Sequence, residues 1–197
     1  MSEEQSSFFS ILFRQKHIRR WGLMHSVMPE NLTEHSAETA DLAHALAVIG
    51  NTYFGKQYDT GRVTELALFH DAPEVYTGDL PTPVKYFSPQ MRESYAAIED
   101  KAIDTLLGKL PPAMRPVYES LLRARPEDEE LHKLVKAADK LSAYLKALSE
   151  EKAGNPEFAR ARLASEKALD AMDCPELAFF RAHFLSSFGM TLDEIQD

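Results

Sequence analysis

The sequence of 197 residues contains a single cysteine, Cys174, which excludes a disulfide within the chain. It also lacks a secretory signal pattern, because the N-terminus begins acidic and its apolar patch is short and interrupted. These two features lead us to expect a cytoplasmic protein. No apolar run approaches the roughly 18–20 residues that a membrane-spanning helix needs, so no membrane association is expected.

Positive charge is scarce as well. The chain has 22 Lys and Arg residues against 31 Asp and Glu residues, which gives a net charge of −9 at pH 7. A protein that binds a nucleic-acid polymer through many phosphate contacts needs the opposite balance, so no such partner is expected. One small phosphorylated ligand, held by a few local cations, remains compatible with this charge.

Long runs of glycine, serine or proline are absent, and 44% of the residues are apolar, which is typical of a globular chain. Alternating strand patterns are missing, whereas apolar residues recur at helical spacing along almost the whole sequence. We therefore predict an all-α fold in a single domain spanning residues 1–197. Three prolines, Pro81, Pro83 and Pro89, interrupt the helical pattern and predict an irregular segment at about 77–89.

Capping signals mark the ends of the predicted helices. Asn31 followed by Glu34 predicts a capping box, and Gly50 predicts the end of that helix. Ser88 followed by Pro89 predicts another helix start. The predicted helices span about 6–18, 31–50, 61–75, 88–108, 112–125, 127–152, 155–172 and 174–189.

The stretch "LALFHDAPEV", residues 66–75, places ionisable side chains at the end of an apolar stripe. Because a helix turns by about 100° per residue, His70 and Glu74 continue this apolar face, and Asp71 lies at its edge. Charged groups that face a core are costly unless they are paired or bind a metal. Pro73 is expected to end or kink the helix at this point.

Two other helices carry polar residues on or beside their apolar faces. His35 shares a face with apolar residues of helix 31–50, whereas His44 lies on the opposite side and should be solvated. Asp139 lies at the edge of the apolar stripe of helix 127–152. Inward polar residues on three helices could therefore meet.

Two imidazoles and two carboxylates, those of His35, His70, Asp71 and Asp139, would then hold one divalent cation. This mixed nitrogen and oxygen set suits Mn, Co, Fe, Ni or Zn more than Ca. The alternative is that each inward histidine is a hydrogen-bonded core residue, which is the commoner role of a lone buried histidine. The combination of all four residues favours the metal site.

The order of these residues, H…HD…D, resembles the signature of HD-domain metal-dependent phosphohydrolases. The segments "RRWGLM", "NLTEHS", "HDAPEVYTGDLPTPVKYF" and "LVKAADKLSAYLKALSE" resemble more closely the bacterial YfbR-type 5′-deoxynucleotidases. The resemblance covers nearly the whole chain, and "GDLPTPVKYF" is its most specific part. It implies an HD-domain helical bundle, a homodimer, and removal of the 5′-phosphate from 2′-deoxyribonucleoside 5′-monophosphates.

The resemblance also implies roles for individual residues. His35, His70, Asp71 and Asp139 match the ligands of one divalent transition-metal ion per subunit, cobalt, manganese or a similar metal. Glu74 matches the catalytic carboxylate, Arg20 the residue that orients the phosphate, and Trp21 its sugar-side neighbour. The further residues expected at the substrate are His35, Asp71, Asp79, Thr82, Pro83, Val84 and Lys85. One departure is the segment around Arg123 and Ala124, where relatives carry acidic residues.

Several alternatives stay open at this point. Glu74 could accept a proton from the attacking water, or it could only position a metal-binding histidine. The residues alone do not distinguish Arg20 from Arg19 as the phosphate ligand. Trp21, the only tryptophan, could be a core anchor. Lys85 could be an ordinary solvated loop lysine.

The reaction has alternatives too. Another HD phosphohydrolase, acting on a triphosphate, a cyclic dinucleotide or an alarmone, would need more cations than Arg19, Arg20 and Lys85 supply. A nucleotide sensor without turnover is disfavoured by the intact ligand set and by Glu74. The phenylalanines near the C-terminus are interpreted as core or dimer interface, and they are Phe180, Phe184 and Phe188.

Overall fold

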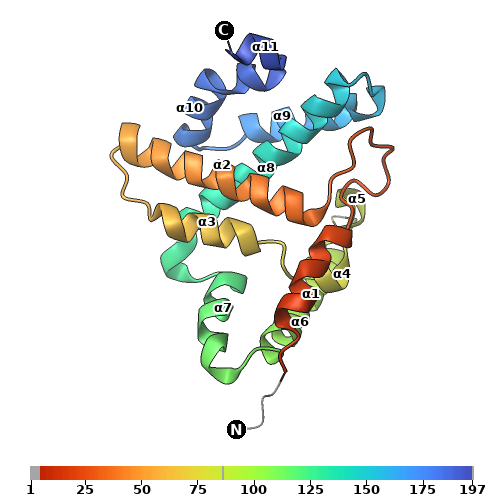
Figure 1. The fold of residues 1–197 in the computed structure, drawn as a ribbon, viewed down its shortest axis with the longest axis vertical. Helices are drawn as coiled ribbons and strands as arrows, with labels where there is room; N and C mark the ends of the chain where they lie inside the picture. The colour runs from red at the N-terminus through yellow and green to blue at the C-terminus, as the bar shows by residue number, and fades with distance from the viewer. Residues whose placement is uncertain (1–4, 86, 197) are drawn as a thin grey trace.

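The computed structural model describes residues 5–85 and 87–196, and helices dominate it (Figure 1). The α-helices are α1 (Phe8–Leu12), α2 (Leu32–Tyr53), α3 (Thr60–Phe69), α4 (Glu74–Thr77), α5 (Thr82–Lys85), α6 (Pro89–Gly108), α7 (Arg115–Leu122), α8 (Glu129–Lys152), α9 (Ala159–Asp170), α10 (Pro175–His183) and α11 (Leu192–Gln196). Short 3₁₀ helices are η1 (Phe13–His17), η2 (Pro112–Met114), η3 (Pro126–Asp128), η4 (Pro156–Phe158) and η5 (Leu185–Gly189). The described residues contain no β-strand, so the predicted all-α class is confirmed.

The centre of the molecule consists of α2, α3 and α8, which pack against one another (Figure 1). Apolar residues of these helices form the larger core, in which Leu46, Val63 and Leu141 are fully buried. Helix α10 covers α2 and contributes Leu177 and Phe180 to the same core. The three helices predicted to carry the polar cluster are therefore neighbours.

A smaller core joins α1, α6 and α7 toward the N-terminal end of the molecule (Figure 1). Phe8 and Leu106 are fully buried in it. Ala72, from the turn after α3, also belongs to this smaller core, whereas Ala67 in the last turn of α3 belongs to the larger one. The turn that contains His70 and Asp71 thus passes from one core to the other.

Two of the predicted helix starts are confirmed. The Asn31 side chain accepts from the backbone N–H of Glu34, and the Glu34 carboxylate accepts from the N–H of Asn31, which is the expected capping box. The Ser88 hydroxyl caps α6, which begins with Pro89.

The predicted end of α2 at Gly50 is wrong, because the helix continues to Tyr53. Gly50 stays in the helix and allows the Tyr58 ring to approach closely. A Cβ at position 50 would lie 2.6 Å from a Tyr58 ring carbon, so the glycine is explained by packing rather than by helix termination.

The predicted helix at 61–75 is divided. Helix α3 ends at Phe69, a turn follows, and α4 begins at Glu74 directly after Pro73. The segment at 77–89 is not wholly irregular, since it contains α5 with Pro83 in its first turn, where a missing N–H is tolerated. Among the described residues, no helix is both long and apolar enough to span a membrane.

Candidate active site

His35, His70 and Asp71 lie together where α2 meets the turn after α3. Each offers one ligand atom, and these atoms lie within 4.8 Å of one another. Nε2 of His70 is 3.2 Å from Oδ2 of Asp71, and Nε2 of His35 is 3.5 Å from the same oxygen. Asp139 of α8 joins them, because its Oδ1 is 3.3 Å from Nε2 of His35. The structure thus brings together these four residues, which we call the ligand cluster.

Hydrogen bonds on the far side of each ring orient the two imidazoles. Nδ1 of His70 lies 2.6 Å from the backbone oxygen of Ala67, so it must donate, and Nε2 is the ring nitrogen that faces Asp71. Nδ1 of His35 lies 3.1 Å from Oγ of the fully buried Ser142. The Ser142 hydroxyl donates in turn to the Glu38 carboxylate at 3.5 Å, so it accepts from His35. Both imidazoles therefore turn Nε2 toward the cluster, where the deprotonated nitrogen can bind a metal ion.

The donor set of the ligand cluster fits a divalent cation. The Nε2 atoms of His35 and His70 are buried and lack a hydrogen-bond partner among the described residues, although carboxylates lie close by. Two imidazole lone pairs and two carboxylates form the mixed set that transition metals prefer. Histidine ligands typically donate their other ring N–H to a neighbouring group, as both rings do here.

The ionisable groups of the ligand cluster lie close enough to shift one another's pKa values. Burial opposes a charged imidazole at His70, but Asp71 and Asp139 outweigh it and raise its pKa to about 9. Burial likewise opposes a charged Asp71, but His70 and His35 lower the pKa of this carboxyl. The pKa of Asp139 is also lowered against its burial, chiefly by the close approach of His35 and by Lys140. Carboxylates held ionised in a buried site attract a cation, whether a proton or a metal ion.

Glu74 begins α4 and is almost completely buried. Its Oε2 has no hydrogen-bond partner among the described residues. Burial, followed by the negative charges of Asp71 and Asp79, raises its pKa to about 9, while Arg20 and Lys85 act against the shift. Glu74 is therefore a proton-holding carboxyl at neutral pH in the absence of a cation.

Arg20 lies at the ligand cluster, whereas Arg19 is exposed. Nη1 of Arg20 is 3.5 Å from Oδ2 of Asp71 and 4.0 Å from Oδ1 of Asp79. Its Nε is 3.4 Å from Oε2 of the buried Glu30. Burial works against its charge, but these carboxylates raise its pKa. Of the two adjacent arginines, Arg20 is the one whose guanidinium lies against the cluster.

Trp21 adopts an unusual backbone conformation with φ of 59°, which L-residues with bulky side chains rarely adopt. Its Nε1 donates to Oε2 of Glu30 at 2.9 Å, the same oxygen that faces Arg20. Its ring meets that of the buried Phe158 edge-on, with centroids 5.3 Å apart. Trp21 is half-buried and belongs to neither of the two apolar cores.

The segment at 77–89 approaches the ligand cluster through Asp79, the partner of Arg20. Lys85 is directed elsewhere: its Nζ is 3.1 Å from Oε1 of Glu99 and lies 4.6 Å from the ring centroid of Tyr95. Pro83 and Val84 are exposed, and Val84 lines an apolar groove between α4 and α6 with a volume of about 630 Å³. The side chain of Thr82 lies outside the described part of the chain.

The structure adds residues that the sequence pattern did not single out. Glu30 contacts and orients both Arg20 and Trp21. This role is visible only in the folded structure, where the loop brings residue 30 back to residues 20 and 21. Ser142 lies three residues after Asp139, so helical spacing alone predicts that the two residues share a face. Arg123, where the resemblance leads us to expect an acidic residue in relatives, pairs with Asp100 and Asp104 of α6 and joins α7 to that helix. Its partners lie outside the ligand cluster. His44 is exposed, as predicted.

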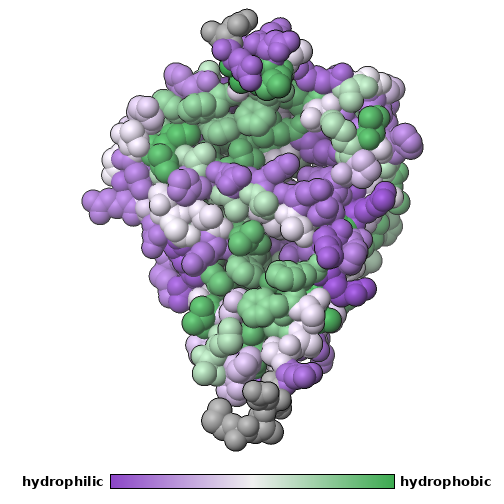
Figure 2. Space-filling view, viewed as in Figure 1, coloured by the Kyte–Doolittle hydropathy of each residue, from purple (hydrophilic) through white to green (hydrophobic). Residues whose placement is uncertain are grey.

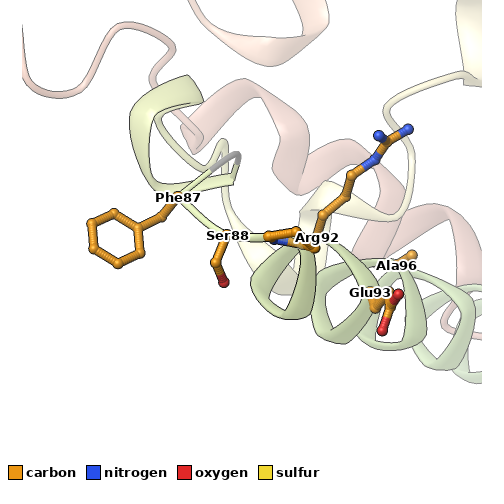
Figure 3. Close-up of a pocket in the computed structure, with 6 residues that line it drawn as sticks. Phe87, Ser88, Arg92, Glu93 and Ala96 are labelled. Carbon is orange, nitrogen blue, oxygen red and sulfur yellow. The ribbon is translucent and has the colours of Figure 1, made fainter.

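Another hollow, with a volume of about 520 Å³, lies at the start of α6 (Figure 3). Phe87, Ser88 and Arg92 line it, but their side chains point in different directions rather than toward a common point (Figure 3). Phe87 is 84% exposed. The hollow contains none of the residues of the ligand cluster and lacks their convergent polar groups.

Comparison with known sequences gives a consistent match. Residues 7–188 match the family described as 5′-deoxynucleotidase YfbR-like. Proteins named 5′-deoxynucleotidase YfbR from Salmonella paratyphi B and Salmonella newport are 47% identical over 192 residues, which is 98% of this chain and 96% of theirs.

Solved structures agree on the fold. An HD-domain phosphohydrolase from Listeria innocua superposes with a TM-score of 0.78 at 20% identity, covering 92% of this chain and 88% of that one. A cyanophage S-2L HD phosphohydrolase, DatZ, solved with dA and one catalytic Zn²⁺ ion, gives a TM-score of 0.62 at 23% identity, with coverage of 92% and 96%. With the helical architecture and the H…HD…D cluster in place, the chain belongs to the YfbR-like 5′-deoxynucleotidase family, and it shares its fold with solved HD-domain phosphohydrolases.

Proposed function

We propose that this protein is a 5′-deoxynucleotidase, a phosphoric monoester hydrolase that releases phosphate from 2′-deoxyribonucleoside 5′-monophosphates. The observation that carries the proposal is the ligand cluster beside one partly buried arginine, Arg20, and one buried glutamate, Glu74. Identity of 47% over nearly the whole chain to proteins named 5′-deoxynucleotidase YfbR supports the same reaction.

In this proposal the ligand cluster holds one divalent transition-metal ion per subunit, with cobalt, manganese and zinc as candidates. Two Nε2 atoms that face the same carboxylate oxygen and two carboxylates with lowered pKa values support this assignment. Such an ion, when bound, lowers the pKa of a coordinated water and polarises a phosphate oxygen. The remaining tasks of binding, orientation and proton transfer belong to the protein.

Arg20 binds the phosphate in this proposal. Its Nε faces Glu30, which fixes the plane of the guanidinium, and its Nη1 faces the ligand cluster at Asp71. A planar fork of N–H donors matches the oxygens of a phosphate better than a lysine ammonium does. Because its neighbours are three carboxylates, Arg20 stays charged when it is buried, ready for an anionic ligand.

Glu74 handles a proton at its unpartnered Oε2. A cation in the ligand cluster would oppose the influence of Asp71 and lower the pKa of Glu74 from its value of about 9. The carboxyl then titrates closer to neutrality, where it can take a proton from the attacking water and return it to the leaving 5′-oxygen. The same residue thereby serves as base and then as acid.

Trp21 discriminates between deoxyribose and ribose in this proposal. It directly follows Arg20, and Glu30 fixes its indole through Nε1. A bulky, mostly apolar ring leaves a 2′-hydroxyl without room and without a hydrogen-bond partner, which disfavours ribose.

We also propose that the protein is a cytoplasmic homodimer. Figure 2 shows apolar residues gathered toward the end of the molecule that holds α10 and α11. Exposed apolar side chains there include Phe184, Phe188 and Leu192, of which Leu192 is 70% exposed. An exposed apolar patch of this kind supports a subunit interface. The single cysteine is consistent with a reducing compartment.

Phosphate release from a panel of nucleotides tests the proposed reaction. The panel contains dAMP, AMP, dATP, a cyclic dinucleotide and an alarmone, each assayed with Co²⁺, Mn²⁺ or Zn²⁺. We expect rapid release from dAMP and little from the others, with Asp139→Ala protein as the control for contaminating phosphatases. Equal use of AMP and dAMP would end the deoxynucleotidase proposal, preference for dATP or a signalling nucleotide would favour another HD phosphohydrolase, and binding without release would favour a sensor.

A further inference from the structure

The loop that carries Arg20 and Trp21, residues 20–30, contains no helix. We call it the Trp21 loop. Its two ends are joined by a backbone hydrogen bond, in which the N–H of Arg20 donates to the oxygen of Glu30. Trp21 also holds a positive φ of 59°, a conformation that persists only when the surroundings impose it. The middle of the loop must therefore be held from outside.

Glu150 of α8 provides this support. The residue is fully buried. Its carboxylate accepts hydrogen bonds from the backbone N–H groups of Val27 at 2.8 Å and Met28 at 2.9 Å, both in the Trp21 loop. It also accepts from Nζ of Lys146 at 2.6 Å and from Nδ2 of Asn155 at 2.9 Å. A single buried carboxylate thus uses its acceptor capacity on two loop amides and two side chains.

The two side-chain partners of Glu150 contact the same loop. Nζ of Lys146 donates to the backbone oxygen of Met28, and Nδ2 of Asn155 donates to the backbone oxygen of His25 at 2.8 Å. Lys146, Glu150 and Asn155, which we call the Glu150 clasp, therefore satisfy both donors and acceptors of the loop backbone. Such a network keeps its geometry because its hydrogen bonds strengthen one another in a buried site.

Two routes lead from the Glu150 clasp to the indole of Trp21. Along the chain, Met28 lies two residues before Glu30, whose Oε2 faces both Trp21 and Arg20. Through space, the Phe158 ring lies between them, since it contacts the Trp21 ring at 5.3 Å on one side and Nζ of Lys146 lies 5.7 Å from its centroid. A displacement of the clasp would therefore reach the side chains at the site.

We propose that Glu150 is a positioning residue for the reaction, one that holds the Trp21 loop so that Arg20 and Trp21 meet the substrate in a fixed orientation. This inference rests on the proposed function. Glu150 lies eleven residues beyond Asp139 on α8, about 16 Å along the helix axis, so it acts through the loop and not on the reacting atoms. We therefore expect Glu150 to affect substrate binding and the preference for deoxyribose, and to have little effect on the rate of the chemical step.

The test compares native protein with Glu150→Gln, which keeps the shape but removes the charge and half of the acceptor capacity. Because Trp21 is the only tryptophan, its fluorescence reports the loop directly. We expect red-shifted, more easily quenched emission, a KM for dAMP raised about tenfold, and a smaller preference for dAMP over AMP. Bound metal should stay native, and kcat should stay within about threefold.

Asp128→Asn is the matched control. Asp128 is also a buried carboxylate of the α8 region, but its partners are Arg62 and Arg125, away from the Trp21 loop. This variant should lose stability and keep native Trp21 emission and KM. If Glu150→Gln fails to fold, Asn155→Ala, which keeps the Lys146–Glu150 pair, should show the same changes to a smaller degree.

The readouts separate the two proposals. Folded Glu150→Gln with native emission, or with altered emission but native KM and sugar preference, overturns the positioning role. The same holds if Asp128→Asn changes emission and KM equally, because a general loss of stability would then explain the effect. Failure of the native protein to release phosphate from dAMP would instead refute the proposed function. An unaltered Trp21 emission in Glu150→Gln would refute the clasp whatever the substrate.

Discussion

Glu74 and Glu150 are both buried glutamates, yet their surroundings differ completely. Glu150 accepts hydrogen bonds from two backbone amides, a lysine and an asparagine, and these partners outweigh burial and lower its pKa to about 2. Glu74 has an oxygen without a partner and two acidic neighbours, and its pKa is raised to about 9. At neutral pH the carboxyl of Glu150 is held charged, whereas that of Glu74 is ready to exchange a proton.

This difference teaches how the fold separates support from chemistry. A buried charge with all of its hydrogen bonds satisfied fixes a structure, because any rearrangement would leave it unpaired. A buried carboxyl without partners is costly to the fold and is retained where its proton is used. The same contrast extends to their neighbours: the imidazole Nε2 atoms near Glu74 also lack partners, while the loop groups around Glu150 are paired.

The largest expected effect comes from removing a member of the ligand cluster. Asp139→Ala takes away the carboxylate that lies 3.3 Å from Nε2 of His35, so bound metal and phosphate release should both fall to background. Trp21 emission should stay native, because the Glu150 clasp is untouched. Metal analysis, the phosphate assay and fluorescence measure these outcomes.

His44→Ala is the control for this change, since His44 is exposed on the opposite side of α2 from His35. It should leave metal content and activity unchanged. Full metal content in Asp139→Ala would show that Asp139 is not a metal ligand. The contrast between the ligand cluster, whose polar atoms lack partners, and the fully hydrogen-bonded Glu150 would then fail.

The next effect concerns Glu74 itself. Glu74→Gln should retain metal and substrate binding but turn over roughly 10²–10⁴ times more slowly, as expected for a lost general base. If Glu74 only positions a metal-binding histidine, metal affinity should fall and excess metal should restore the rate. Titration of activity with metal distinguishes these results.

The stability of Glu74→Gln sharpens the comparison with Glu150. Because the folded pKa of Glu74 is raised from 4.5 to about 9, its contribution to stability is fully present below pH 4.5 and is lost as the pH rises toward 9. Glutamine mimics the protonated form, so metal-free Glu74→Gln should melt higher than native protein at pH 8 and similarly at pH 4. Glu150→Gln should melt lower at pH 8, and thermal melts at both pH values compare the two.

The ligand cluster could be predicted from the sequence because its signals are local. The inward face of His35, the His70-Asp71 pair before Pro73, and the edge position of Asp139 all follow from helical periodicity. The capping box at Asn31 is likewise a local pattern. Periodicity predicts which side chains of a helix face the core. Where three such helices pack together, these side chains meet.

The support around the cluster could not be predicted in this way. Glu150 and the loop amides that it holds are more than 100 residues apart, and the loop has no period that would indicate a partner. The residues alone did not separate Arg20 from Arg19, because only the folded loop shows which one faces Asp71. Lys85 was expected near the substrate, and its contact with Glu99 depends on the packing of α5 against α6.

A smaller effect is expected at the sugar. The native protein should prefer dAMP over AMP by about 10²-fold, because an apolar wall alone rejects an added hydroxyl only to that extent. Trp21→Ala should narrow the preference chiefly by raising kcat/KM for AMP. Phe87→Ala is the aromatic control, since Phe87 is 84% exposed and lies outside the ligand cluster. An unchanged preference in folded Trp21→Ala protein would leave Trp21 with a structural role only.

The smallest effect is a change of stability with pH at Glu150. Its folded pKa is lowered from 4.5 to about 2, so the stability that it contributes is fully present above pH 4.5 and is lost as the pH falls toward 2. The shift corresponds to roughly 3 kcal/mol. Native protein should therefore be more stable than Glu150→Gln at pH 7, by about 5–10 °C in Tm, and this gap should close between pH 4.5 and 2. The difference between the melting curves of the two proteins, recorded without metal, isolates the contribution of Glu150 to stability, because all other carboxyls are present in both. A gap that persists unchanged at pH 2 would mean that the shape of Glu150, and not its charge, holds the Trp21 loop.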